Sequence, residues 1–195
     1  ASDRVSLRST SASTSLSAGA GDDMVVIGSL APRVGGGTLN QLAGRVDVDG
    51  MEGNDTLLVD DTGDSAHNQG VFNRNEITGL GTNGIGYENM EGLELSLGDG
   101  GNDLEIRGTM QSGDARVVSV VNTGDDDDTV RVSLNSQTDG LLSLNLESGD
   151  DAVDARASKL GSVYFGGLGD DVIQAGDGDD TIFADRGVVT FFAAD

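Results

Sequence analysis

The stretch GGLGDDVIQAGDGDDTIF at residues 166–183 decides the fold, because it contains one nine-residue pattern twice in succession. Each copy is rich in glycine and aspartate, and an apolar residue stands two positions after the last aspartate. Asp171 thus precedes Ile173, and Asp180 precedes Ile182. Glycine lets the backbone turn sharply, and an alternating apolar run after a turn is typical of a strand with one buried face. The stretch therefore predicts two tight acidic turns, each followed by a short strand.

Looser copies of the pattern recur along the chain. They read AGAGDDMVVI at 18–27, GMEGNDTLLV at 50–59, GDGGNDLEI at 98–106, TGDDDDTVRV at 123–132 and ESGDDAVDA at 147–155. From Asp103 through Asp128 and Asp151 to Asp171, the final aspartates recur at intervals of roughly 20 to 25 residues, which is the length of a solenoid coil. The shorter step from Asp171 to Asp180 is half a coil.

Two longer intervals interrupt this period. The interval from Asp23 to Asp55 fits one coil with an inserted loop around residues 31–37. The interval from Asp55 to Asp103 fits two coils with one degenerate turn near residues 79–86. The segment 61–92 is the least repetitive part of the chain, and we expect a longer loop there.

The predicted fold class is all-β: a right-handed parallel β-solenoid of about eight or nine coils that forms a single domain over residues 1–195. Alternating runs such as LELSL at 93–97 and LSLNL at 142–146 supply the strands, since alternation indicates one buried and one solvated face. The 31 glycines and the single proline suit tight, repeated turns.

The chain is strongly acidic, with 34 acidic and 11 basic residues and a net charge of -23. Such a field repels phosphates, which argues against partners such as nucleic acid or anionic membranes and favours cations. High charge with low hydrophobicity is typical of chains that do not fold unaided, so we expect folding to be coupled to cation binding. No apolar run is long enough for a membrane span, and the absence of cysteine excludes disulfides and thiolate metal sites.

The pair of turns at 166–183 resembles the nonapeptide G-G-x-G-x-D-x-U-x of RTX (hemolysin-type) calcium-binding proteins, where U is a large apolar residue. The sequence between the copies, such as VDVDGMEGNDTLLVDDTGD at 46–64 and GYENMEGLELSLG at 86–98, is similar to repeats of large secreted surface proteins. The resemblance implies a β-roll or parallel β-helix that binds several Ca²⁺ ions between stacked turns. Backbone carbonyls and carboxylates suit this cation, which takes 6 to 8 oxygen ligands in flexible geometry. Residues 1–17 would then be a first coil without calcium.

The candidate calcium ligands are the last acidic residue of each turn and the glycine two positions before it, where one is present. They are Gly21 and Asp23, Gly53 and Asp55, Asn102 and Asp103, Asp128, Gly149 and Asp151, Gly169 and Asp171, and Gly178 and Asp180.

The turn at 98–106 allows two registers. If Asp103 takes the aspartate position, Glu105 points into the core. If Asn102 takes it, Leu104 and Ile106 point inward instead. Both registers stay open at the level of the sequence.

Two other features have alternative interpretations. The acidic turn DDTGD, with Asp60, Asp61 and Asp64, is either a further cation site or a solvated loop. The apolar segment VVTFFAAD at 188–195 either starts another coil or serves as a cap, an interface or part of a secretion signal.

These observations predict a non-catalytic, calcium-binding, extracellular structural module, such as a rigid spacer, filament, surface-layer or adhesin repeat. We expect it to fold on binding Ca²⁺, to be part of a longer secreted or cell-surface protein, and to associate end to end, because solenoid ends expose strand edges. Glycans or a cell surface are further candidate partners. One lysine, one histidine and two tyrosines leave few candidates for catalysis. The alternative is an accessory module of a secreted polysaccharide-acting enzyme or RTX exoprotein.

Overall fold

The computed structural model describes residues 1–110 and 117–185, and every regular element in these ranges is a β-strand. In chain order the strands are β1 (Arg4–Leu7), β2 (Thr14–Ala20), β3 (Met24–Ile27), β4 (Val46–Glu52), β5 (Thr56–Asp60), β6 (Gln69–Phe72), β7 (Glu76–Gly79), β8 (Thr82–Glu88), β9 (Gly92–Ser96), β10 (Asp103–Ile106), β11 (Val118–Asn122), β12 (Thr129–Val132), β13 (Leu141–Asn145), β14 (Ala152–Asp154), β15 (Val163–Phe165), β16 (Val172–Gln174) and β17 (Thr181–Phe183). The prediction of an all-β chain is confirmed.

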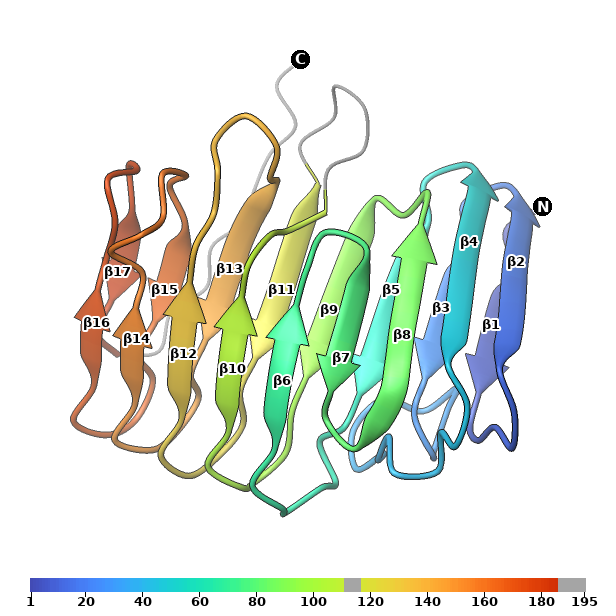
Figure 1. Ribbon diagram of the computed structural model, residues 1–195, viewed down its shortest axis with the longest axis horizontal. Helices are drawn as coiled ribbons and strands as arrows, with labels where there is room; N and C mark the ends of the chain where they lie inside the picture. The colour runs from blue at the N-terminus through green and yellow to red at the C-terminus, as the bar shows by residue number, and fades with distance from the viewer. Residues whose placement is uncertain (111–116, 186–195) are drawn as a thin grey trace.

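The strands form two sheets that face each other along the molecule (Figure 1). The eight-stranded sheet has the order β1-β3-β5-β9-β11-β13-β15-β17, and the nine-stranded sheet has the order β16-β14-β12-β10-β6-β7-β8-β4-β2. Outside β6, β7 and β8, the chain passes from one sheet to the other with each successive strand, and neighbouring strands are parallel. This is the arrangement expected of stacked coils, while their hand and number stay predictions.

The turns between the sheets lie in two rows. The upper edge, named for its place in Figure 1, contains the turns that lead into the eight-stranded sheet, among them 21–23, 53–55, 89–91 and 175–180. The lower edge contains the turns that lead into the nine-stranded sheet, among them 61–68, 97–102, 123–128, 146–151 and 166–171.

The core lies between the sheets and consists of apolar side chains stacked from coil to coil. In the eight-stranded sheet, one inward row is Ile27, Val59, Leu95, Val121 and Leu144. Each of these side chains is at most 1% exposed, and burial of such a side chain stabilises a fold by about 1.5–3 kcal/mol. A facing row in the nine-stranded sheet contains Leu104, Val130 and Val153. The alternation seen in the sequence thus builds a continuous apolar interior.

An antiparallel insertion makes the nine-stranded sheet wider than its partner. β7 pairs antiparallel with β6 and with β8, β8 continues the sheet on β4, and β6 continues it on β10. The prediction of a degenerate solenoid turn near residues 79–86 is therefore wrong, because these residues form the β7–β8 hairpin. Leu80 and Gly81 there have φ values of 52° and 68°, the left-handed conformation that tight hairpins require.

The other long interval is a true insertion between adjacent coils. β3 pairs directly with β5 in parallel, and residues 28–45 form the connection from β3 to β4. The structure therefore agrees with the interpretation of residues 31–37 as part of an inserted loop. The segment 188–195 lies outside the described residues.

Candidate calcium site

A ladder of hydrogen bonds joins the last residues of the lower-edge turns from 61–68 to 166–171, each to its equivalent in the next coil. The backbone N–H of Asn102 donates to Oδ1 of Asp128 at 2.6 Å, and the N–H of Asp128 donates to Oδ1 of Asp151 at 2.7 Å. The N–H of Asp151 then donates to Oδ1 of Asp171 at 3.2 Å, and at the other end the N–H of Asn68 donates to Oδ1 of Asn102 at 3.3 Å. One side-chain oxygen per coil thus fixes the register of the stack.

A second ladder of the same kind lies on the upper edge in the N-terminal half. The N–H of Asp3 donates to Oδ1 of Asp23 at 2.6 Å, and the N–H of Asp23 donates to Oδ1 of Asp55 at 2.7 Å. The N–H of Asp55 donates to Oε2 of Glu91 at 2.8 Å, so a glutamate takes the corner position of the following coil. The acidic turns therefore change edges along the chain, and Glu91 is a ladder residue that the Gly-Asp pattern did not reveal.

The second carboxylate oxygen of the ladder aspartates is buried and has no hydrogen-bond partner. This holds for Oδ2 of Asp23, Asp55, Asp128, Asp151 and Asp171. A buried, unpaired carboxylate oxygen is costly in a protein interior. The ladders thus leave one buried acceptor open at each of these five aspartates.

Burial disfavours the charged form of three of these carboxylates, those of Asp55, Asp128 and Asp151. Burial raises the pKa of Asp151 to about 7, and the charges of Asp128 and Asp171 contribute to this increase. Burial also raises the pKa of Asp128 to about 6 and moves the pKa of Asp55 upward. The hydrogen bonds that these carboxylates accept oppose the shifts but do not cancel them. A bound cation would reverse this effect, because an opposite charge favours the ionised form.

Glycine in the turns brings the backbone carbonyls of neighbouring coils together. Gly149 and Gly169 have φ values of 149° and 133°, a region that side chains rarely allow. A Cβ atom at Gly169 would lie 1.9 Å from the carbonyl oxygen of Gly149, and one at Gly53 would lie 2.1 Å from that of Gly21. Four of the five predicted glycines, Gly21, Gly53, Gly149 and Gly169, therefore lie against a backbone carbonyl oxygen of the neighbouring turn.

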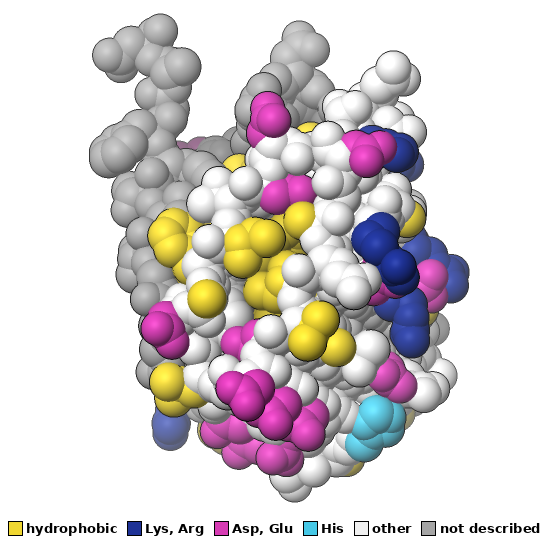
Figure 2. Space-filling view, turned by 90° about the vertical axis from the view of Figure 1, so that its left-hand side faces the viewer, with side chains coloured by type: hydrophobic (Ala, Val, Ile, Leu, Met, Phe, Trp, Pro, Cys, Tyr) yellow, Lys and Arg dark blue, Asp and Glu magenta, His cyan; other side chains and the backbone are white. Residues whose placement is uncertain are grey.

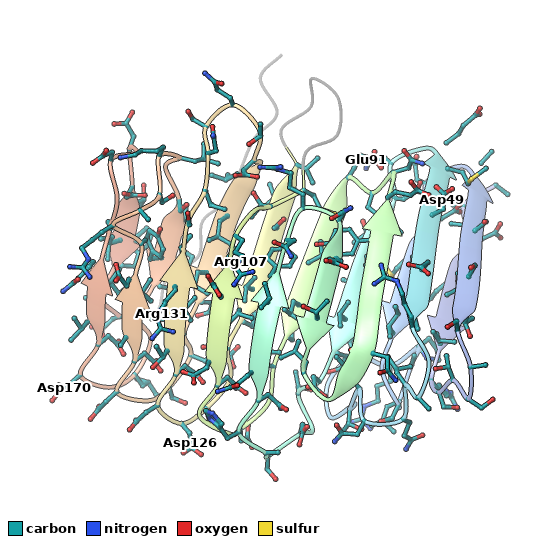
Figure 3. The ribbon with its side chains drawn as sticks, viewed as in Figure 1. Asp49, Glu91, Arg107, Asp126, Arg131 and Asp170 are labelled. Carbon is teal, nitrogen blue, oxygen red and sulfur yellow. The ribbon has the colours of Figure 1, made fainter. Side chains whose placement is uncertain are left out.

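An outer row of aspartates runs beside the lower-edge ladder. The N–H of Asp150 donates to Oδ1 of Asp127 at 2.8 Å, and the N–H of Asp170 donates to Oδ1 of Asp150 at 2.9 Å. These side chains are exposed, and Figure 3 places Asp126 and Asp170 at this edge. This row was not among the predicted ligands, although an acidic residue directly before the ladder aspartate is a visible signal in all three turns.

The donor set fits Ca²⁺ better than a metal that needs many side-chain ligands. The described residues contain no group of three or more His, Cys, Asp or Glu side chains that could hold an ion. Ligands would instead have to combine an open carboxylate oxygen with turn carbonyls from two coils. Calcium accepts such all-oxygen sets, in which carbonyls and carboxylates mix. The orphaned Oδ2 atoms and the close-packed carbonyls thus agree with the ion that the resemblance implies.

The structure distinguishes the two registers at 98–106. Asn102 is 2% exposed and occupies the ladder position, while Leu104 and Ile106 point into the core. Asp103 begins β10 with its side chain 39% exposed and lies 3.7 Å from Nε2 of His67. Asp103 therefore does not take part in the ladder.

Asp180 and Gly178 lie on the upper edge, away from Asp171. Oδ1 of Asp180 accepts the N–H of Ser162 at 2.9 Å, and a Cβ at Gly178 would lie 2.2 Å from the nitrogen of Gly161. The adjacent coil thus presents Gly161 and Ser162 here instead of a second Gly-Asp turn.

The acidic turn DDTGD is buried and not a solvated loop. Oδ2 of Asp60 accepts the N–H groups of Gly35 and Gly37 at 2.9 and 3.1 Å, and Oδ1 of Asp61 accepts that of Leu39 at 2.8 Å. Asp60, Asp61 and Asp64 are 1%, 0% and 8% exposed. Asp60 and Asp61 therefore hold the inserted loop against the solenoid.

One comparison with known proteins finds a match, and it lies over the C-terminal turns. No curated protein and no solved structure matches the chain, and within the described residues no helix is long and apolar enough to cross a membrane. The family model of the RTX calcium-binding nonapeptide repeat, with four copies, matches residues 163–190. This part of the chain therefore carries RTX calcium-binding repeats, which confirms the resemblance seen in its sequence.

Proposed function

We propose that the protein is a non-catalytic, extracellular structural module that becomes compact when Ca²⁺ binds its stacked acidic turns. One observation supports this proposal above all. Each ladder aspartate at Asp23, Asp55, Asp128, Asp151 and Asp171 uses one oxygen to join two coils and leaves the other buried without a partner.

The energetics favour folding that depends on the ion. Moving a carboxylate into a protein interior costs on the order of several kcal/mol, and here the cost recurs from coil to coil. The chain also carries a net charge of -23, so compaction brings like charges together. Because a turn from the next coil is needed to complete each ligand set, ion binding and stacking would occur together.

Export from the cell is consistent with this coupling. Calcium sites of extracellular modules bind in the range of about 0.1 to 1 mM. Sites of that strength would stay empty at the low calcium concentration of a cytosol and fill outside. The chain would then be loose before secretion and rigid afterwards.

End-to-end association is the second part of the proposal, with another copy of this solenoid as the partner. Leu168, Val172 and Ile182, in and next to the last described strands, are 53%, 55% and 47% exposed. Figure 2 shows apolar side chains across this end of the molecule, above the acidic side chains of the lower edge. An exposed apolar end with open strand edges favours stacking of one solenoid on another.

A non-catalytic role is supported by the settings of the only lysine and the only histidine. The ammonium of Lys159 pairs with the exposed Asp177, and His67 is 60% exposed beside Asp103. Both side chains are open to solvent.

Far-ultraviolet circular dichroism of the full chain, with and without chelator, tests the proposal. We expect the strand signal to fall in chelator and to return on titration with Ca²⁺ but not with the same concentration of Mg²⁺. Strand content that ignores chelator would contradict calcium-dependent folding. Sedimentation and electron microscopy of the calcium form test end-to-end association, which monomers at high concentration would contradict.

A further inference from the structure

Asn102 occupies the position at which the following coils carry an aspartate. Its backbone N–H donates to Oδ1 of Asp128 at 2.6 Å, and its own Oδ1 accepts the N–H of Asn68 at 3.3 Å. The backbone and the first side-chain oxygen therefore make the same contacts as those of Asp128 and Asp151. Only the second terminal atom differs, because it is Nδ2 instead of Oδ2.

The amide nitrogen of Asn102 bridges two carbonyl groups of different coils. Nδ2 donates to the carbonyl oxygen of Gly98 at 3.2 Å, in its own turn, and to that of Thr123 at 3.1 Å, in the next coil. The side chain is buried, so both hydrogen bonds lie away from water. The amide thus donates hydrogen bonds to backbone carbonyl oxygens, which are the kind of ligand that a cation between two turns would contact.

The next coil has no side-chain amide at the equivalent position, where Asp128 stands instead of an asparagine. The register pairs Asp103 with Thr129 and Asn122 with Asn145, so Gly124 and Leu146 stand where Gly98 and Thr123 stand around Asn102. Oδ2 of Asp128 is an acceptor and has no partner. The carbonyls of Gly124 and Leu146 each accept one other hydrogen bond, from the N–H of Ser148 at 3.4 Å and the hydroxyl of Thr123 at 3.2 Å, and each retains a second lone pair.

We propose that the side-chain amide of Asn102 replaces a Ca²⁺ ion, so that the turn at 97–102 stacks on its neighbour without metal. Calcium positions on the lower edge then begin at Asp128. A neutral amide presents two N–H donors to two carbonyls, whereas a carboxylate at the same place adds a charge and an unsatisfied acceptor that only a cation can complete. This inference rests on the proposed function, because it assumes that the aspartate turns bind calcium.

The contact that Asn102 makes with the next coil lies at the boundary between the insertion and the C-terminal coils. β10 follows Asn102 and pairs with β6 of the antiparallel insertion on one side and with β12 on the other. The junction between the insertion and the C-terminal coils is therefore held by the amide in every calcium concentration. The aspartate coils beyond it depend on the ion.

Asn102→Asp and Asp128→Asn test the proposal in opposite directions. Isothermal titration should give one more bound ion per chain for Asn102→Asp than for the wild type, and one fewer for Asp128→Asn. In chelator, Asn102→Asp should lower the melting temperature and Asp128→Asn should raise it. Ser136→Asp, which adds the same charge to the exposed loop between β12 and β13, is the matched control and should leave the stoichiometry unchanged.

The outcomes separate this inference from the proposed function. A wild type that binds no calcium contradicts the proposed function. A wild type that binds calcium, with the same stoichiometry in Asn102→Asp, overturns the role of the amide. If Asn102→Asp does not fold, nuclear magnetic resonance of the wild type decides: the Asn102 side-chain amide protons should exchange slowly and keep their shifts through a calcium titration. Rapid exchange, or a large shift on calcium binding, would show that the amide does not close the site.

Discussion

The backbone N–H of Asp128 and Oδ1 of Asp151 form a 2.7 Å hydrogen bond across two coils of the lower edge. The two oxygens of the Asp151 carboxylate therefore have different surroundings. One oxygen sets the register of the stack, and the other lacks a partner and is available to an ion. Substitutions that keep or remove each oxygen can separate their effects.

Asp151→Asn should stabilise the protein in chelator and remove one bound calcium ion. The asparagine side chain keeps Oδ1 as the acceptor for the N–H of Asp128. The substitution also removes a buried carboxyl group, whose pKa burial raises to about 7. Asp151→Ala should destabilise both states by about 1–3 kcal/mol, because it leaves a buried N–H group without an acceptor. Chemical denaturation with and without calcium measures both effects. Asp99→Asn, which removes an exposed charge from a lower-edge turn, should change neither result, and equal effects of Asp99→Asn and Asp151→Asn would contradict the interpretation.

Gly169→Ala should destabilise the C-terminal coils by more than a strained backbone alone explains. A side chain at this φ of 133° is unfavourable by about 1–3 kcal/mol, and its Cβ would also lie 1.9 Å from the carbonyl oxygen of Gly149. Gly35 also has a positive φ, of 98°, so Gly35→Ala strains the backbone in the same way, but no atom would lie within 4 Å of the new Cβ. Thermal unfolding should therefore show a larger decrease in melting temperature for Gly169→Ala than for Gly35→Ala. Similar losses would mean that the contact between turns is looser than the structure shows.

The sequence predicted the repeating corners but not the edge on which each corner lies. Asp23, Asp55, Asp128, Asp151 and Asp171 all occupy ladder positions, because a Gly-Asp turn before an alternating run is a local signal. Whether a strand joins one sheet or the other depends on how many strands come before it. The hairpin of β7 and β8 adds two strands to the same sheet and leaves the alternation between the sheets unchanged. Nothing local in the Gly-Asp turns therefore marks the point at which the acidic ladder moves from the upper to the lower edge.

Local alternation would have resolved the register at 98–106, since burial of Leu104 and Ile106 instead of Glu105 is the favourable choice. The buried state of Asp60 and Asp61 could not be predicted in this way. Their partners, the N–H groups of Gly35, Gly37 and Leu39, lie more than 20 positions earlier in the chain. Nothing in the local sequence of the turn indicates that an inserted loop returns to it.

Asp61 should make stability depend on pH. Burial is the main cause that raises its pKa to about 7; Asp64 and Asp60 contribute by charge repulsion, and the hydrogen bond from Leu39 opposes the shift. A carboxyl whose pKa is higher in the folded than in the unfolded state gives a stability contribution that is full below pH of about 4 and is lost as pH rises towards 7. Asp61→Asn should therefore gain stability relative to the wild type between pH 4 and pH 8. Denaturation at several pH values measures the difference between the two proteins, and a difference that stays constant with pH would contradict this assignment.

The response to different salts should separate specific ion sites from general screening of charge. Sodium chloride screens the repulsion of a chain with net charge -23, and at 1 M the screening length is only about 3 Å. In chelator, high salt should therefore recover part of the strand signal without filling the positions beside the buried Oδ2 atoms. Magnesium should do little more, because it prefers a near-octahedral shell and gives up its water reluctantly. Calcium should restore the full signal at millimolar concentration, and should do so at low and at high salt. If sodium chloride alone restored the full signal and the same melting temperature, the compact state would depend on screening, and the orphaned oxygens of Asp128 and Asp151 would need no ion.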